Sequence, residues 1–155
     1  MSVEFYGTRE ITVDGAGRVK LPSAFRREFE INGFGPDVVV AYRELNGQGF
    51  MMLYPRGVWK RVLEHVSEVP DLSALDVEAM RRRLNRWSEM ASMDKQGRIM
   101  LPKRFTEKAG LSAGSEVALV GSGNRIEVWQ LALCDKTVNE TELDDEKIAA
   151  VLNYK

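Results

Sequence analysis

One pattern recurs in this chain at a fixed offset of 80 residues. Residues 14–26 read DGAGRVKLPSAFR, and residues 94–106 read DKQGRIMLPKRFT. Six of the thirteen positions are identical, among them a glycine and a proline. A repeat of this kind indicates a duplicated structural unit. Each unit of about 50 residues is too small to bury a large core alone, so we expect the two to pack against each other or against other chains.

In each unit, the residues before and after the repeated turn are expected to pair as a β-hairpin. The segment 7–14 is rich in strand-forming residues, and residues 18–21 continue in an extended conformation after the turn. Asp14 can accept hydrogen bonds from the backbone that follows it, and Gly17 supplies the positive φ of the turn exit. The second unit repeats this plan with strands near 89–93 and 98–101 around a turn at 94–97.

A short helix and a second hairpin are expected after each turn. Pro22 suits the first turn of a helix, where an N–H lacks a partner anyway. Phe25 and Phe29 then share one face of that helix, and Gly110 is expected to end its counterpart in the second unit. The further strands are expected at 38–43, 50–54, 116–120 and 125–129, with turns at 46–49 and 121–124.

Helical periodicity between and after the units completes the expected organisation. Apolar residues at helical spacing predict helices from Pro55 to Val66 and from Asp76 to Trp87, and a tail helix at 142–153. We expect Trp59, Trp87 and Trp129 to pack in cores or interfaces. The fold class is therefore α+β and rich in strand. Its parts are expected at 5–55 (first repeat), 56–88 (helical connector), 89–130 (second repeat) and 131–155 (tail).

The charge is unevenly distributed along the chain. The 155 residues carry 22 Lys and Arg against 23 Asp and Glu, a net charge of −1 that at first sight disfavours a nucleic-acid partner. Residues 81–108, however, carry nine basic and three acidic groups, net +6. Such a segment is either a solvated helix face with a basic loop or part of an anion-binding surface. Solvated or interface positions are expected for Arg81, Arg82, Arg83 and Arg86.

Several functional classes are disfavoured. A single Cys134 excludes an internal disulfide and a cysteine metal cage, and a single His65 disfavours histidine catalysis and zinc sites. No apolar run approaches the ~20 residues of a membrane span, and the first residues lack a secretory signal pattern, so we expect a cytoplasmic protein. We expect no cofactor, no metal, no small-molecule substrate and no enzymatic activity. A pairing of the Asp14 and Asp94 carboxylates for acid–base chemistry is left as an open alternative, although their adjacent arginines favour ion pairing.

The two D-x-x-G-R-V/I-x-L-P segments resemble those of the MraZ family of bacterial transcriptional regulators. Each half is similar to the AbrB/SpoVT type of swapped-hairpin DNA-binding domain. Residues 51–55 (MMLYP) followed by Trp59, and residues 93–98 (MDKQGR), also resemble that family. The resemblance covers roughly residues 5–130. The chain departs from the family at Gly15-Ala16, where a lysine is usual, and at Thr106, where arginine is common.

This resemblance implies tandem AbrB-like swapped-hairpin β-barrel repeats with short helices. It also implies ring-like homo-oligomers, binding to double-stranded DNA, and short promoter repeats ahead of a division and cell-wall gene cluster as the target. The protein is accordingly expected to be nucleoid-associated. An oligomeric protein-interaction scaffold of the same fold, which does not read DNA, is the alternative.

The candidate DNA-binding residues lie at and beside the repeated turns. Arg18 and Arg98 follow the turn glycines, and an arginine there can bind phosphate or a guanine edge with both arms of its planar fork. Alternatively, Asp14 and Asp94 pair with these arginines and only rigidify the turns. Further basic candidates for phosphate contact are Arg9, Lys20, Lys95, Lys103 and Arg104, with Arg26 and Arg27 nearby.

Overall fold

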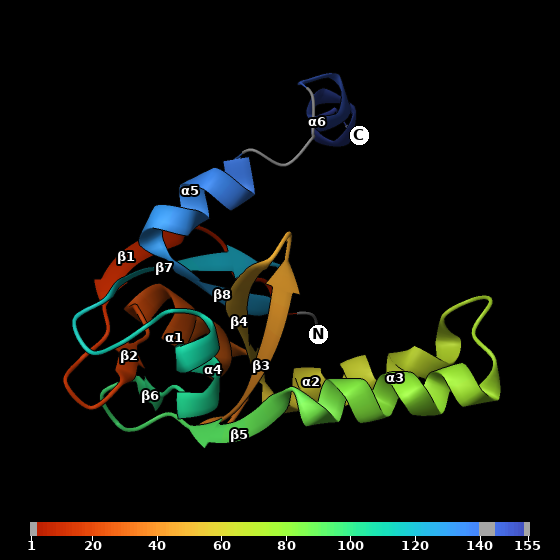
Figure 1. Ribbon diagram of the computed structural model, residues 1–155, viewed down its shortest axis with the longest axis horizontal. Helices are drawn as coiled ribbons and strands as arrows, with labels where there is room; N and C mark the ends of the chain where they lie inside the picture. The colour runs from red at the N-terminus through yellow and green to blue at the C-terminus, as the bar shows by residue number, and fades with distance from the viewer. Residues whose placement is uncertain (1–2, 140–144, 154–155) are drawn as a thin grey trace.

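The computed structural model describes residues 3–139 and 145–153 and shows a mixed, strand-rich fold (Figure 1). This confirms the α+β class. Six antiparallel strands form one sheet in the order β1-β7-β8-β4-β3-β5, and β2 and β6 form a separate two-stranded sheet. The strands are β1 (Thr8–Thr12), β2 (Arg18–Lys20), β3 (Asp37–Leu45), β4 (Gln48–Pro55), β5 (Ser88–Ser92), β6 (Arg98–Met100), β7 (Glu116–Ser122) and β8 (Arg125–Gln130).

Most strand pairs join one repeat to the other. β1 pairs with β7, β2 with β6, β4 with β8 and β3 with β5, whereas only β3–β4 and β7–β8 are pairs within a repeat. The hairpins expected around the two repeated turns are therefore wrong. Each turn closes on itself, but the strands on either side of it diverge to partners in the other repeat. The physical reason is that one repeat cannot cover its own apolar surface.

The second hairpin of each repeat forms as expected. β3 and β4 join at Asn46-Gly47, whose φ angles of 52° and 77° are those of the tight turn that suits twisted strands. β7 runs on to Ser122, so the turn before β8 is shorter than the sequence indicated and centres on Gly123-Asn124.

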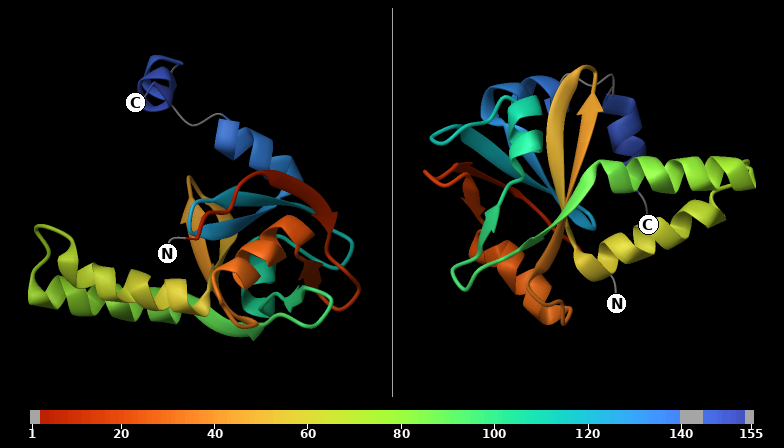
Figure 2. Two further views of the ribbon diagram at one scale, coloured as in Figure 1. Left: turned by 180° about the vertical axis from the view of Figure 1, so that it is seen from behind. Right: turned by 60° about the horizontal axis from the view of Figure 1, so that its bottom comes forward.

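Two short helices follow the repeated segments and lie within the curve of the large sheet (Figures 1 and 2). They are α1 (Ser23–Ile31) and α4 (Lys103–Lys108), and each starts directly after its proline rather than including it in the first turn. Phe25 and Phe29 are 3% and 1% exposed, which confirms the predicted apolar face. Gly110 follows α4 with φ of +69°, as expected for a helix stop.

Two helices between the repeats project from the sheet as an antiparallel pair, which we call the arm (Figure 2). The arm contains α2 (Arg56–His65), the 3-10 turn Val66–Glu68 and α3 (Ala74–Arg86). α3 starts two residues before the predicted position because Ser73 caps it: the Asp76 N–H donates to Ser73 Oγ and the Ser73 N–H donates to Asp76 Oδ2, both at 3.1 Å. α3 is fully described and buries none of its residues.

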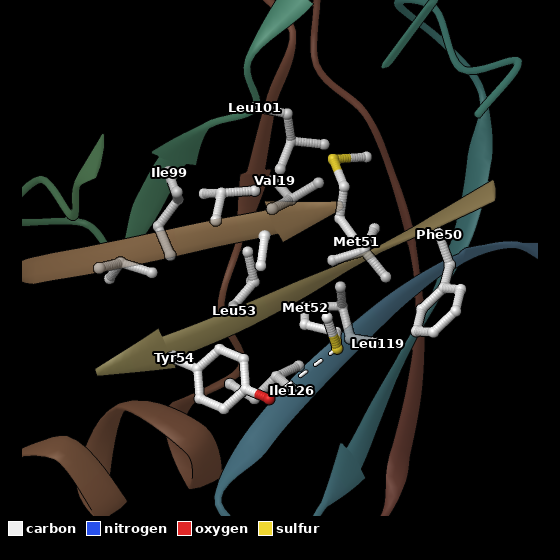
Figure 3. Packing of buried hydrophobic residues seen from close by; sticks show 14 of the residues in the cluster. Val19, Phe50, Met51, Met52, Leu53, Tyr54, Ile99, Leu101, Leu119 and Ile126 are labelled. Atoms are coloured by element: carbon white, nitrogen blue, oxygen red, sulfur yellow. Dashed lines mark hydrogen bonds between the residues drawn. The ribbon is translucent and has the colours of Figure 1, made fainter. Parts of the chain in front are cut away.

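One apolar core combines residues from both repeats (Figure 3). Phe50 of β4 stacks on Trp129 of β8 with ring centroids 4.1 Å apart. Trp59 and Trp129 are 6% and 2% exposed, and Trp87 packs at the edge of the core, so the three tryptophans pack as expected. His65 is exposed on α2.

The tail begins with a helix that the sequence pattern did not predict, α5 (Leu131–Asn139). Cys134 on α5 is buried against the core, and burial raises the pKa of its thiol. The predicted tail helix is present as α6 (Asp145–Leu152). Its expected first residues, 142–144, lie outside the described part of the chain.

Candidate nucleic-acid interface

The two repeated turns have the same internal geometry. Asp14 Oδ1 accepts hydrogen bonds from the backbone N–H groups of Ala16 (2.9 Å) and Arg18 (2.8 Å). Asp94 Oδ1 accepts from Gln96 and Arg98, both at 2.9 Å. The turn exits, Gly17 and Gly97, have φ of +87° and +83°, a region that glycine adopts without steric cost. The repeated Asp and Gly thus fix the shape of each turn.

Each turn aspartate also forms an ion pair with its arginine. The Nε atoms of Arg18 and Arg98 lie 2.8 and 2.7 Å from Oδ2 of Asp14 and Asp94. The hydrogen bond from the arginine backbone N–H, followed by that from its side chain, holds the pKa of each carboxyl below its usual range despite some desolvation. Asp14 and Asp94 therefore pair within their own turns rather than with each other.

Both proposed roles of the turn arginines are compatible with this pairing. The ion pair engages Nε, so the two terminal nitrogens of each guanidinium lie beyond it. The side chains of Arg18 and Arg98 are 31% and 33% exposed. The aspartates orient the arginines without covering them. A guanidinium group that is already oriented loses less conformational entropy when it binds a planar anion.

The two turns are brought together by the β2–β6 ribbon. In its register Arg18 lies opposite Met100, Val19 opposite Ile99, and Lys20 opposite Arg98. Val19 and Ile99 are fully buried. Because side chains alternate along a strand, the remaining four point to the opposite, outward side. We call this outward side the ribbon face; its residues are Arg18, Lys20, Arg98 and Met100.

The other basic candidates have different surroundings. Lys95 is exposed in the second turn, and Lys103 is exposed on α4, 4.0 Å from Glu107. Arg9 is exposed on β1, where it donates to the Thr8 carbonyl. Arg104 pairs with Glu89 at 3.3 Å, donates to the carbonyl of Arg86 at 2.9 Å, and stacks over the Phe105 ring at 4.4 Å.

Arg26 on α1 contacts the second turn directly. Its Nη2 donates to the Lys95 carbonyl at 3.0 Å, and a Cβ added to Gly97 would lie 2.6 Å from its Cδ. Arg26 therefore links the helix of one repeat to the turn of the other. Exposed Arg27, the next residue, makes the same charge available to solvent.

Met100 was not among the sequence-predicted site residues. It is 49% exposed on the ribbon face, at the position equivalent to Lys20. The offset of 80 residues and strand alternation could have indicated it, but only the pairing of β2 with β6 shows that it lies beside Arg18. Within the described residues, no cluster of acidic, histidine or cysteine side chains suits a metal, and no helix is long and apolar enough to cross a membrane.

The fold and the ribbon face define a two-repeat, strand-rich protein that exposes a short basic ribbon. The chain belongs to the MraZ family. It is 34% identical over 145 residues to the transcriptional regulator MraZ of Pediococcus pentosaceus, with 94% of both chains covered. It is 33% identical over 145 residues to that of Natranaerobius thermophilus, again with 94% of both covered. The family's sequence model, described as "MraZ protein, putative antitoxin-like", matches residues 89–152.

Proposed function

We propose that this protein is a DNA-binding transcription regulator and not an enzyme, and that the ribbon face contacts double-stranded DNA. The observation that carries the proposal is that β2–β6 pairing brings Arg18, Lys20 and Arg98 to one exposed surface. The name transcriptional regulator, shared by the relatives, supports it.

The β2–β6 ribbon is a two-stranded element of the kind that the major groove accommodates. That groove admits a two-stranded β-ribbon, and several DNA-binding proteins place strands there. On this face Arg18 and Arg98 are the candidates for two-pronged contact with a guanine edge or a phosphate, oriented by Asp14 and Asp94. Lys20, Lys95, Lys103 and Arg9 are candidates for phosphate contacts, which position a protein but carry no sequence information.

The contacts of Arg104 make it the weakest of the candidates. It is engaged with Glu89 and with the backbone at the end of α3, so moving it to DNA would break those bonds. Arg104 remains a proposed DNA contact at the edge of the interface. We expect its removal to weaken the packing of α4 against β5 as well as DNA binding.

One ribbon with three cations gives modest affinity, so the proposal includes a homo-oligomeric ring. Several ribbons held in one assembly engage spaced promoter repeats together, and effective concentration then raises the avidity. The cross-repeat pairing of strands supports tandem AbrB-like swapped hairpins as the fold type. The proposed targets are promoter repeats of a division and cell-wall gene cluster, which places the protein in the cytoplasm on the nucleoid.

The test is DNA binding by the Arg18→Ala/Arg98→Ala double variant, measured at two salt concentrations on the promoter duplex and on an unrelated duplex. We expect at least roughly a tenfold weaker affinity for the promoter, since one good bidentate contact contributes about 1–3 kcal/mol of discrimination. The salt dependence should also weaken by about 0.9 in log K per log unit of salt for each phosphate that the variant no longer neutralises.

The matched control is Lys60→Ala/Arg82→Ala, which removes two exposed cations from the arm. It should bind as the wild type does. Unchanged promoter affinity in a folded Arg18→Ala/Arg98→Ala protein would reject the ribbon face as the DNA contact and favour the scaffold of the same fold that does not read DNA.

A further inference from the structure

Each repeated turn is held against the other repeat by one backbone hydrogen bond. The Leu21 N–H donates to the Gly97 carbonyl at 2.8 Å, and the Leu101 N–H donates to the Gly17 carbonyl at 3.1 Å. Leu21 and Leu101 are equivalent in the two repeats, as are Gly17 and Gly97. At the level of this backbone contact the two turns are therefore supported alike.

A side chain adds a further support to the second turn. Arg26 on α1 is half-buried, and its Nη2 donates to the Lys95 carbonyl at 3.0 Å. Its equivalent 80 residues later is Thr106 on α4, which is also half-buried but donates to the Lys103 carbonyl of its own helix at 3.0 Å. Within the described part of the chain, the first turn therefore has no counterpart of the arginine contact.

Arg26 also lies against the backbone of the second turn. A Cβ added to Gly97 would lie 2.6 Å from the Arg26 Cδ and 2.8 Å from its Nε, closer than real Cβ contacts. A Cβ added to Gly17 would instead meet the Met100 Sδ at 3.8 Å, an ordinary van der Waals distance. The guanidinium end of Arg26 thus packs on the glycine that directly precedes Arg98.

The composition of the two turns adds to this difference. The first turn reads Asp-Gly-Ala-Gly-Arg at 14–18, whereas the second reads Asp-Lys-Gln-Gly-Arg at 94–98. Because glycine loses more conformational freedom on folding than any other residue, the additional Gly15 makes the first turn more costly to order. The turn with more intrinsic freedom is thus the one for which the equivalent position carries threonine instead of arginine.

We propose that Arg26 is a positioning residue for Arg98, which it holds in place for DNA through the backbone of the second turn. This inference rests on the proposed function of the ribbon face. Each turn arginine is fixed at Nε by its own aspartate, and the second turn is held from α1 as well. Arg18 and Arg98 are similarly exposed, so they differ in preorganisation rather than in access. A group that is fixed before binding loses less conformational entropy on binding.

The first test measures the turns themselves, without DNA. Residue-resolved amide hydrogen exchange of the full-length protein reports how often each turn opens. Arg26→Ala should speed exchange within residues 94–98 and leave residues 14–18 unchanged, because the lost contact belongs to the second turn. The matched control, Arg27→Ala, removes the neighbouring exposed arginine of α1 and should leave exchange in both turns unchanged. Wild-type exchange in the Arg26→Ala protein, or an equal increase in both turns, would overturn the proposal.

The second test asks whether Arg26 acts on DNA binding through Arg98. At low salt, where binding by the variants stays measurable, Arg26→Ala should weaken promoter affinity by roughly three- to tenfold, in the range of coupling between neighbouring residues. The same loss should persist in an Arg18→Ala background and disappear in an Arg98→Ala background, since a residue that acts through Arg98 has no effect without it. An unchanged affinity contradicts the positioning role, and an equal loss in both backgrounds would mean that Arg26 contacts DNA itself.

Thr106→Arg tests the converse, because it places an arginine on α4 at the position equivalent to Arg26. We expect slower exchange within residues 14–18 and a tighter promoter complex, with the gain in affinity absent in the Arg18→Ala background. A gain that survives in that background is a general charge effect and counts against the proposal. The two proposals fail separately: normal promoter binding by Arg18→Ala/Arg98→Ala rejects the proposed function, whereas unchanged exchange in Arg26→Ala rejects the positioning role.

Discussion

Val19 and Ile99 lie directly opposite each other at the centre of the β2–β6 ribbon, and they occupy the same position in the two repeats. Both are fully buried. The repeats are thus related by an approximate two-fold axis that passes between these side chains. Equivalent residues of the two repeats, such as Arg18 and Arg98, are placed on the same outward face by this relationship.

Shortening Ile99 should destabilise the whole protein, because it joins the two repeats inside the core. We expect Ile99→Ala to lower the free energy of unfolding by about 2–5 kcal/mol, from reduced burial and the cavity left behind. Denaturant unfolding measures it. The neighbouring Met100→Ala, at an exposed position, should stay within about 0.5 kcal/mol of the wild type. Similar losses of stability for both would contradict the assigned burial of the ribbon.

Adding a cation at the second-repeat equivalent of Lys20 should strengthen DNA binding. Met100→Lys places a fourth cation on the ribbon face, and one additional phosphate contact steepens the dependence of log K on log salt by about 0.9. Salt titration of promoter binding measures this slope. Met90→Lys adds the same charge at an exposed position of β5 and should leave the slope unchanged. An equal effect of both variants would indicate a general charge effect rather than a contact at the ribbon.

Removing Glu127 should destabilise the large sheet at strand β8. Its Oε2 accepts from Arg125 at 2.9 and 2.7 Å, and its Oε1 accepts from the Trp129 indole at 3.0 Å. Burial acts to lower the pKa of Arg125, but the hydrogen bonds to Glu127 and Tyr54 and the electrostatic attraction of both groups together outweigh burial, so the pKa is raised.

Glu127→Ala leaves the Trp129 indole N–H without its acceptor, and it leaves the half-buried Arg125 guanidinium with the Tyr54 hydroxyl, 3.3 Å from its Nη1, in place of a carboxylate. We expect a decrease of roughly 2–3 kcal/mol in the free energy of unfolding. Glu116→Ala removes an exposed carboxylate from β7 and serves as the control, with a change within about 0.5 kcal/mol. A Glu127→Ala protein as stable as the control would show that Arg125 finds another partner.

The turn aspartates should stay ionised in acid. Their pKa values are lowered from the ordinary 3.8, and the largest contribution comes from the hydrogen bonds donated by the backbone N–H groups of Arg18 and Arg98. A lowered folded-state pKa stabilises the fold above pH 3.8, and that contribution disappears as pH falls through the folded-state value. Carboxyl titration by NMR should therefore place both midpoints below 3.8.

The backbone N–H of residue 98 is the largest contributor to the lowered pKa of Asp94, and alanine retains that N–H. Arg98→Ala should therefore leave the pKa of Asp94 lowered, but by less than in the wild type. The carboxyl of Asp14 in the same variant is the internal reference. A midpoint for Asp94 at the ordinary value in Arg98→Ala would show that the ion pair, not the backbone, sets the pKa.

Local features of the fold were predictable because they depend on neighbouring residues. The Asn46-Gly47 turn, the Phe25 and Phe29 face of α1 and the stop at Gly110 follow from backbone preference and helical spacing alone. α5 was missed because its short apolar start, Leu131 to Cys134, continues directly from β8 without a turn signal.

The sequence by itself determined that there are two equivalent turns, each with an aspartate, a glycine and an arginine at set spacing. Only the tertiary structure decided where those turns lie. The flanking strands pair across the repeats, since neither repeat can bury its apolar surface alone, and this pairing puts Arg18 and Arg98 on one face. Long-range pairing depends on which buried surfaces fit together, a property that spacing along the chain does not contain.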